Sequence, residues 1–328
     1  MNILLAYDGV LPATHYGGVE RVIWALAMSL NNRGHNVTLL AASSSHCQFA
    51  KVIIYDPGLS LNEQVPDHID LVHCHFPFNR VKHIDKPLVV TLHGNAKQNE
   101  HLHPNTVFLS KNHAQRHGGE CVVYNGLNWN DYPTPDFSKT RKGFHFLGKA
   151  AWRVKNVNGA IKTVLKLPKE TLNVVGGNRL NFKMGFRFTL TQRVKFYGTV
   201  GGQEKFDVLN QSKGLVFPVL WDEPFGLAII ESLYFGCPVY GTPYGSLPEL
   251  INSSVGVLSN SSDELALAMT NNTFNVKDCY EYANDSFNAD RLCEDYINIY
   301  EKVLNNYTLN SKEPEAHKLN KNIGFLFY

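Results

Sequence analysis

Several features that mark common protein classes are missing from this sequence. No apolar run approaches the roughly 18 residues that a membrane-spanning helix needs. The cysteines, six in all, include no C-x-x-C pair, so neither a disulfide framework nor a zinc ribbon is indicated. Met1 leads directly into a strand-like stretch rather than into a signal peptide. We therefore expect a reduced, cytoplasmic protein.

A strong excess of charge of either sign is missing as well. The net charge is only +2 and the isoelectric point is about 8.1, whereas domains that bind nucleic acids usually exceed about 9. A nucleic acid is therefore not an expected partner, and a weakly basic surface permits contact with the inner face of a membrane without indicating it. What the chain does have is 44% hydrophobic residues over 328 positions, which is enough for two packed domains of ordinary size.

The small net charge hides an uneven distribution. Residues 137–203 hold 14 Lys or Arg and a single acid, Glu170, whereas residues 204–315 hold 17 acids and 6 bases. A basic segment beside an acidic one could line a groove that receives an anion. Alternatively, the two segments simply complement each other within one folded body, and the charge pattern alone leaves both interpretations open.

Strand-type and helix-type runs alternate from the first residue, which predicts parallel sheets covered by helices. The first series begins with a strand at 3–7 and a helix that ends at Arg33, before a glycine C-cap. A polar, proline-rich stretch at 130–136 is typical of a linker, and a second series begins with a strand at 144–147. The pattern predicts two doubly wound α/β domains with a cleft between them.

The stretch 222–232 carries the most informative pattern. Glu223 follows a predicted strand at 215–219, in the kind of loop where open parallel sheets bind ligands. Gly226 opens a helix, whose free N–H groups and positive dipole end attract a phosphate. Glu231 lies among apolar residues on that helix, where a carboxylate needs hydrogen-bond donors such as a ribose diol. The alternative is a helix with one polar edge and a capping glutamate.

Glu223 and Glu231, with seven residues between them and Pro-Phe-Gly-Leu after the first, resemble the E-x7-E motif of retaining glycosyltransferase family 4. Other segments resemble this family in order and spacing over about residues 1–305. They are a glycine loop at 17–21, a histidine turn at 91–94, an Asn-Gly turn at 123–126, the opening of the second domain at 146–157, and closing turns at 236–239 and 245–249.

The resemblance implies the GT-B fold of that family, in which two Rossmann-like domains face each other across a cleft. Residues 1–136 would form the acceptor domain and residues 137–287 the nucleotide-sugar domain, while a helix and tail at 288–328 would return to the first domain. Glu231 would bind the ribose hydroxyls, and Glu223 would face the donor sugar and diphosphate. Three backbone positions would complete this donor site: Phe225, Gly226 and Leu227.

The family binds the diphosphate with an Arg in a Gly-Arg pair and a Lys a few residues on, and this sequence departs from that pattern. Lys149 follows Gly148 where Arg is usual, and the spacing to Lys155 is one residue longer. We therefore expect Arg153 and Lys155 to form the clamp, with Lys149 at its rim. Such cations stabilise the charge that develops on a leaving diphosphate, which favours the anion-binding interpretation of the basic segment.

His93 ends an apolar strand at 88–92, at the carboxyl edge where ligands bind. The resemblance implies a histidine here beside the reacting sugar or the acceptor, whereas the alternative is a histidine hydrogen-bonded to its own turn. Gly17 and Gly18 lack the G-x-G-x-x-G spacing of a dinucleotide site. We expect them to let the backbone approach the donor phosphate or the acceptor.

A metal site is not expected. H-x-H sequences occur at 73–75 and 101–103, but no carboxylate or cysteine pattern completes a zinc site around them. The sequence also contains no Asp-x-Asp, the signature of a metal-bridged diphosphate in the other large glycosyltransferase fold. No cofactor is expected besides the donor substrate itself.

These features predict a retaining, metal-independent hexosyltransferase of glycan or glycolipid biosynthesis, with a nucleoside-diphosphate sugar as donor. Lipid-linked glycans, polysaccharides and small molecules all remain open as acceptors. A sugar-nucleotide epimerase of the same fold is the alternative among enzymes, and turnover without any acceptor would identify it. A non-catalytic sugar-nucleotide-binding protein is the alternative from another class, against which Glu223, Glu231 and Lys155 count.

Overall fold

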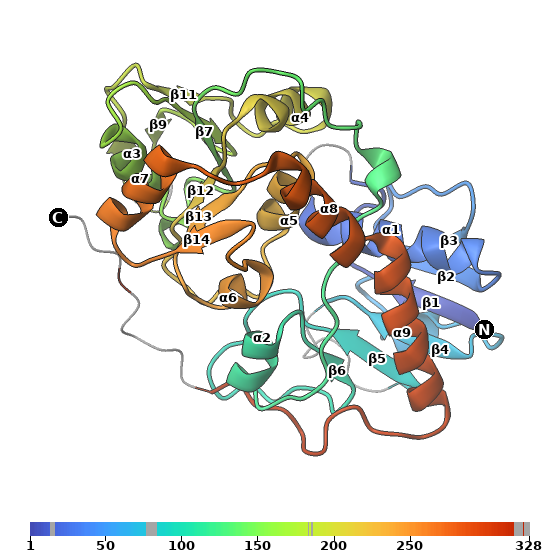
Figure 1. Ribbon diagram of the computed structural model, residues 1–328. Coiled ribbons are helices and arrows are strands. Elements are labelled where there is room, and N and C mark those ends of the chain that lie inside the picture. Colours follow the sequence, from blue (N-terminus) through green and yellow to red (C-terminus); the bar gives the residue numbers. More distant parts are fainter. Residues whose placement is uncertain (14–16, 77–83, 183, 185, 318–323, 325–328) are drawn as a thin grey trace. The chain divides into compact units, whose positions relative to one another are not determined.

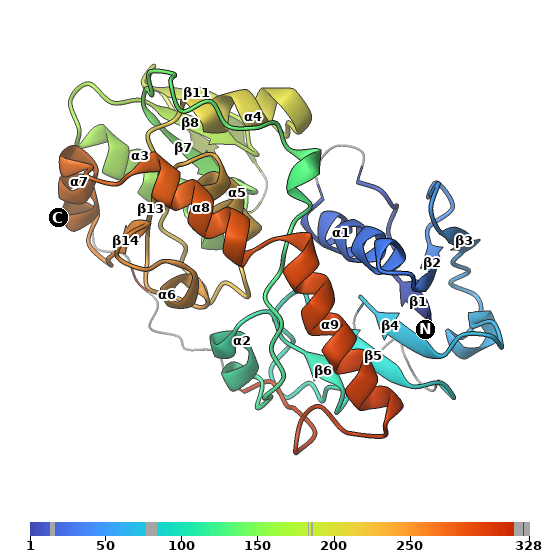
Figure 2. The ribbon, with the colours of Figure 1, turned by 45° about the vertical axis from the view of Figure 1, so that its right-hand side comes forward.

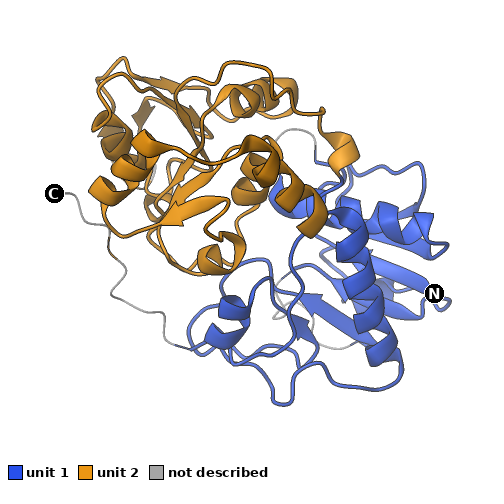
Figure 3. Cartoon of the chain, in the orientation of Figure 1, with its two compact units in different colours: residues 1–128, 287–319 blue, residues 129–286, 320–328 orange. Residues whose placement is uncertain are grey.

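The computed structural model describes residues 1–13, 17–76, 84–182, 184, 186–317 and 324 (Figure 1). Within these residues the chain divides into two compact units (Figure 3). The first unit holds residues 1–128 and the later segment from 287 to 317, and the second holds residues 129–286 together with Gly324. The predicted linker at 130–136 therefore belongs to the second unit, because the Trp129 ring stacks on Tyr234 of that unit with ring centroids 4.3 Å apart.

The first unit is built on a parallel sheet of six strands in the order β3-β2-β1-β4-β5-β6. Strands β4 and β5 are buried at every position, as expected for a parallel sheet covered on both faces. The strands are β1 (Asn2–Ala6), β2 (Asn36–Ala41), β3 (Lys51–Ile54), β4 (Leu71–Cys74), β5 (Leu88–Thr91) and β6 (Thr106–Val107).

The helices of the first unit include one that the chain adds only after passing through the second unit. This helix, α9 (Ala289–Leu304), packs against α1 (Gly18–Asn32) (Figure 2). Arg33 donates a hydrogen bond to the Asp290 carbonyl at 3.2 Å and ties the two helix ends together. Two shorter helices, η1 (Asn62–Gln64) and α2 (Lys111–Arg116), lie in the connections between strands.

The second unit repeats the architecture with a parallel sheet of six strands in the order β11-β8-β7-β12-β13-β14. The strands are β7 (Phe144–Leu147), β8 (Leu172–Val175), β11 (Val194–Phe196), β12 (Leu215–Phe217), β13 (Val239–Gly241) and β14 (Gly256–Leu258), and a small hairpin adds β9 (Leu180–Asn181) and β10 (Arg187–Phe188). The helices are η3 (Trp129–Asp131), η4 (Arg153–Lys155), α3 (Val157–Leu165), α4 (Gly202–Gln211), α5 (Leu227–Tyr234), α6 (Leu247–Leu250), α7 (Ser262–Asn271) and α8 (Val276–Ser286).

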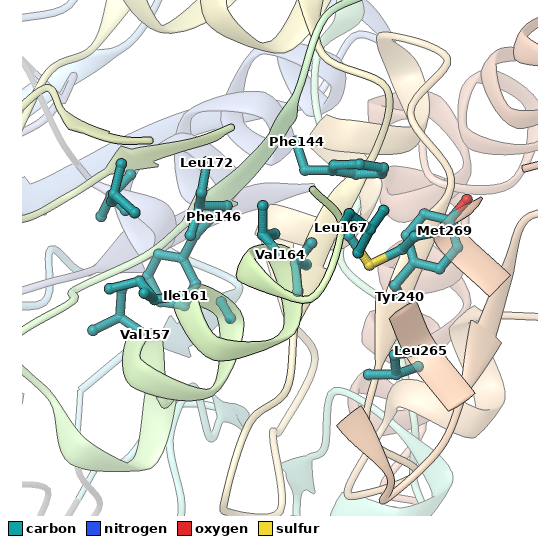
Figure 4. Packing of buried hydrophobic residues seen from close by; sticks show 14 of the residues in the cluster. Phe144, Phe146, Val157, Ile161, Val164, Leu167, Leu172, Tyr240, Leu265 and Met269 are labelled. Atoms are coloured by element: carbon teal, nitrogen blue, oxygen red, sulfur yellow. The ribbon is translucent and has the colours of Figure 1, made fainter. Parts of the chain in front are cut away.

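A core of aromatic and branched side chains holds α3 and α7 onto the sheet of the second unit (Figure 4). Phe144 and Phe146 from β7 are fully buried, and Phe144 meets Tyr240 of β13 edge-on. Truncating such a buried ring to alanine costs about 3–5 kcal/mol. The core therefore fixes β7 and α3, between which the predicted clamp residues lie.

The strands β7, β8 and β12 deliver their following loops to one edge of the sheet, because parallel strands share the position of their carboxyl ends. The first two of these loops touch through backbone alone. At Gly176, which has φ of +110°, a Cβ atom would lie 2.1 Å from the Gly148 carbonyl oxygen. Only glycine allows both that conformation and that approach.

No helix in the described part of the chain is long and apolar enough to cross a membrane.

Candidate functional site

The loop that carries Glu223 is fixed by a glycine-serine pair from another part of the second unit. Gly245 has φ of +61°, and a Cβ atom there would lie 2.2 Å from the Glu223 backbone nitrogen. The next residue, Ser246, donates its N–H to the Glu223 carbonyl at 2.9 Å and its hydroxyl to the Phe225 carbonyl at 2.5 Å. The closing turn at 245–249 therefore shapes the loop of the predicted donor site.

Two of the predicted site residues meet directly. Lys155 Nζ lies 2.5 Å from Glu223 Oε2, and the Trp221 indole N–H donates to the same oxygen at 2.8 Å. Glu223 is only 6% exposed, so a cationic partner and a second donor offset the cost of burying its carboxylate. The Lys155 ammonium also lies over the Trp221 ring, 4.8 Å from its centroid, which stabilises a partly desolvated cation.

The position of Lys155 is set by the backbone on either side of it. Leu220 donates its N–H to the Val154 carbonyl at 2.7 Å, which joins η4 to the loop after β12. Asn156 adopts the left-handed conformation with φ of +54° and caps α3 by accepting from the Gly159 N–H at 2.9 Å. Its amide also donates to the Pro218 carbonyl at 2.8 Å. Hydrogen bonds on both sides of Lys155, at Val154 and at Asn156, thus hold its ammonium next to Glu223.

Gly226, with φ of +94°, is the N-cap of α5, and Leu227 is the first residue of that helix. The helix that Gly226 was predicted to open is therefore observed to begin one residue later. Phe225 is buried beneath this turn. The free N–H groups at the start of α5 follow directly after the loop that carries Glu223, an arrangement that suits an anionic ligand.

Glu231 has partners that the sequence did not predict. The Tyr132 hydroxyl donates to Glu231 Oε1 at 2.7 Å, and the Lys205 ammonium from α4 forms an ion pair with the same oxygen. Glu231 is 5% exposed and Lys205 is 1% exposed. Lysine is almost never buried to this degree without a partner. Nothing in the segment around Lys205 pointed to Glu231.

The other two predicted cations are exposed and have different partners. Arg153 donates from Nε to the Met184 carbonyl at 2.6 Å. Lys149 lies over the Trp152 ring at 5.0 Å from its centroid. Neither contact involves Glu223, so the structure joins Lys155 alone of the three predicted cations directly to that carboxylate.

The basic segment 137–203 uses part of its charge within the second unit, and its binding of an anion stays a prediction. Part of it is structural, since Arg193 donates to the carbonyls of Leu165 and Leu167 at 2.8 and 2.6 Å. Another part pairs with the acidic segment, as Lys166 does with Asp263 at 2.6 Å. The clamp candidates are a minority of its charges.

In the first unit, His93 follows β5 and is joined to a second histidine. His93 Nε2 lies 2.9 Å from Nδ1 of His75, and the two rings stack with centroids 5.2 Å apart. Burial lowers the pKa of His93 to about 4, so this ring is neutral near pH 7. A neutral imidazole offers one donor and one acceptor rather than a positive charge.

The surroundings of His75 select the tautomers of this pair. His75 Nε2 is buried and has no hydrogen-bond partner among the described residues. A buried N–H without an acceptor costs more than a lone pair without a donor, so the proton of His75 belongs on Nδ1. His75 then donates to His93 Nε2, and His93 keeps its own proton on Nδ1. The His75 ring, the second histidine of the H-x-H sequence at 73–75, thus orients His93.

The other histidine of the pair at 73–75 completes a buried network. His73 Nε2 and Nδ1 lie 2.7 Å from the Thr91 hydroxyl and the Tyr300 hydroxyl. Tyr296 lies 2.7 Å from Thr91 through its own hydroxyl. No group of three or more His, Cys, Asp or Glu side chains within the described residues could hold a metal ion, and metal independence stays a prediction.

The glycine loop of the first unit opens α1, with Gly17 as its N-cap and Gly18 as its first residue. A Cβ atom at Gly17 would lie 2.6 Å from a carboxylate oxygen of Glu20. That carboxylate accepts a hydrogen bond from the Tyr7 hydroxyl at 2.9 Å. Glycine at position 17 therefore makes room for a carboxylate on the first turn of α1.

Two cavities of the second unit are lined by other residues. Two cavities of about 530 Å³ have linings that include Asn173 and Asp207 in one and Glu170 and Met269 in the other. No predicted site residue lines either cavity.

Both halves of the chain match protein families of one class. Residues 16–125 match the family described as Glycosyltransferase Family 4, and residues 141–272 match the family described as Glycosyl transferases group 1. The protein is a glycosyltransferase with the GT-B fold. The chain belongs to the group 1 glycosyltransferases of the family 4 type. No curated protein matches it in sequence.

Solved structures show the same fold at low sequence identity. AviGT4, a glycosyltransferase involved in avilamycin A biosynthesis, is similar with a TM-score of 0.77 and 18% identity, covering 94% of this chain and 99% of its own. Sucrose-phosphate synthase from Thermosynechococcus elongatus has a TM-score of 0.71 and 16% identity, covering 93% and 99%. HepE from Anabaena, in complex with UDP-glucose, has a TM-score of 0.66 and 18% identity, covering 93% and 99%.

Proposed function

We propose that this protein transfers a hexose from a nucleoside-diphosphate sugar to an acceptor hydroxyl and retains the anomeric configuration. The observation that carries the proposal is the buried ion pair of Lys155 and Glu223, which stands beside the N-terminus of α5. A cation and free backbone N–H groups suit a diphosphate, and a carboxylate suits the hydroxyls of a sugar. The complex of the structural neighbour HepE with UDP-glucose supports a donor of this class.

The proposed reaction exchanges one C1–O bond for another on the same face of the sugar. The bond from C1 to the leaving diphosphate breaks, and the acceptor oxygen forms the new bond. The acceptor proton passes to a phosphate oxygen of the leaving group, so no side-chain nucleophile is needed. Lys155, with Arg153 beside it in η4, stabilises the negative charge that builds on the diphosphate. That charge compensation makes a divalent metal unnecessary in this proposal.

The proposed roles of the remaining residues follow from their contacts. Neutral His93, oriented by His75, offers its Nδ1–H as a donor to a hydroxyl of the sugar or the acceptor. Glu231 accepts hydrogen bonds from the ribose, in addition to those from Lys205 and Tyr132. Gly17 has no side chain, so an acceptor or a phosphate can approach the backbone at the first turn of α1.

A donor panel tests the proposal directly. Thermal unfolding is measured with UDP-, GDP-, ADP-, CDP- and dTDP-sugars, and a ligand at about 100 times its Kd should add about 2.7 kcal/mol of stability. The donor that binds is then incubated with candidate acceptors, and the anomeric configuration of the product is read by NMR. Inversion would contradict the retaining mechanism. Interconversion of the sugar without any acceptor would instead identify an epimerase, and binding without turnover a non-catalytic protein.

A further inference from the structure

The hairpin β9–β10 of the second unit exposes an unusual amount of apolar surface. Twelve large hydrophobic side chains are exposed among the described residues, and half of them lie within residues 180–190. Their exposed fractions run from 45% to 81%. Soluble monomers seldom expose large contiguous apolar patches unless they serve binding. We call this set the apolar hairpin: Leu180, Phe182, Met184, Phe186, Phe188 and Leu190.

The base of the hairpin is firmly built. Arg179 donates to the carbonyls of Thr189 and Val194, each at 2.6 Å, and so closes the segment into a loop. Arg187 donates to the Asn178 carbonyl at 2.9 Å and lies over the Phe196 ring. These contacts fix both ends of the hairpin while its apolar side chains remain exposed. The apolar surface therefore belongs to a folded segment.

The charge around the hairpin selects the kind of surface that it fits. Residues 171–203 contain five Lys or Arg and no acid. Lys195, which follows the hairpin in β11, is exposed. Apolar and aromatic side chains next to basic ones bind at the boundary of lipid headgroups and acyl chains, and the bases favour anionic lipids. A purely apolar partner surface would gain nothing from these charges.

The hairpin is also joined to the predicted donor clamp. The Met184 carbonyl accepts the hydrogen bond from Arg153 Nε at 2.6 Å, and Arg153 belongs to the same short helix as Lys155. A surface bound by the hairpin therefore lies beside the clamp of the second unit. This position suits an acceptor that is itself carried by lipid.

We propose that the apolar hairpin docks the second unit on an anionic lipid surface. The docking does not depend on glycosyl transfer, since it uses side chains outside the donor site. Insertion of the Phe182 and Phe186 rings supplies apolar burial, and the exposed Lys195 faces the headgroups.

Vesicle co-sedimentation of the full-length protein, without donor, tests this proposal. We expect binding to vesicles of phosphatidylcholine mixed with phosphatidylglycerol, and much weaker binding to phosphatidylcholine alone. The double variant Phe182→Ser, Phe186→Ser should lose roughly tenfold or more of the binding, because two rings lose their apolar burial. Its melting temperature should stay unchanged, since both rings are exposed. The matched control is Leu267→Ser on α7, a 64% exposed position of the same unit, which should bind like the unaltered protein.

Several outcomes would overturn the docking. One is the absence of binding to the mixed vesicles, and another is a double variant that binds as well as the control. Self-association in lipid-free buffer that requires both rings would assign the patch to a second copy of the chain. Donor turnover is measured separately in lipid-free buffer, so a failure of the proposed transferase activity is distinguishable from a failure of docking.

Discussion

The pair of Glu231 and Lys205 gives a quantitative test of the second unit. Lys205→Met removes a cation that is 1% exposed and leaves a carboxylate that is 5% exposed without its ionic partner. Breaking a buried ion pair on one side costs about 3–5 kcal/mol. For folded units of about 150–250 residues, each kcal/mol lowers the melting temperature by roughly 2–4 °C. Residues 129–286 form a unit of this size, so we expect a loss of roughly 6–20 °C.

Calorimetry of four proteins decides whether the reasoning holds. The control is Lys166→Met, which breaks a solvent-exposed pair with Asp263 and should cost less than about 1 kcal/mol. The double variant Lys205→Met, Glu231→Gln removes both buried charges and should be more stable than Lys205→Met alone. If Lys205→Met unfolds no earlier than Lys166→Met, the pair does not stabilise the fold and the argument fails.

A further variant, Glu231→Gln alone, separates the two roles available to Glu231. If the carboxylate binds ribose, Glu231→Gln should weaken binding of the bare nucleoside diphosphate by about 1.5–3 kcal/mol, the scale of a hydrogen bond to a charged group. Titration calorimetry measures this below the melting temperature. An unchanged nucleotide Kd in the folded variant would leave Glu231 with the structural role alone.

The remaining predictions concern the clamp, the metal and the histidines. Lys155→Ala and Arg153→Ala should each lower kcat by about 10²–10³ while changing the donor KM less, with Lys149→Ala milder; a severe Lys149→Ala beside a near-normal Arg153→Ala would reverse the assignment. EDTA should leave transfer unchanged, and loss restored by Mg²⁺ or Mn²⁺ would disprove metal independence. The pKa of His93 near 4 lies below its unfolded value of about 6.5, so its contribution to stability is complete above pH 6.5 and declines as pH falls toward 4. His75→Asn should lower kcat, and the pH profile of kcat should gain no new titration near pH 6.5. A titration near pH 6.5 in the kcat profile of the unaltered enzyme would contradict a neutral His93.

The class of fold could be predicted from the sequence because its local hydrophobic patterns are those that a parallel sheet covered by helices requires. Short apolar strands alternating with helices admit few other arrangements, and two six-stranded parallel sheets are observed. The meeting of Lys155 with Glu223 follows from the same rule, since both residues come after strands that end at one edge. The family assignment was confirmed by the matches to both halves of the chain.

Partners that come from distant segments could not be predicted in this way. The cation for Glu231 is on α4 and the hydroxyl is on Tyr132, which the proline-rich composition around it marked as linker. His75 belongs to an H-x-H pattern, but its role depends on a ring nitrogen that has no hydrogen-bond partner among the described residues, which a sequence does not show. The exposure of the apolar hairpin was equally hidden, since alternating Phe and basic residues are also typical of a half-buried strand.

The return of the chain to the first unit has a consequence for biosynthesis. His73 and Thr91 form buried hydrogen bonds with Tyr300 and Tyr296, two residues of α9. The second unit is almost entirely one continuous stretch, residues 129–286, and can complete its sheet on the ribosome as soon as that stretch emerges. The first unit begins earlier but lacks part of its interior until α9 has been translated. A nascent chain stalled before residue 287 therefore carries a finished second unit and an unfinished first one, and a fragment ending at 128 has the same gap permanently.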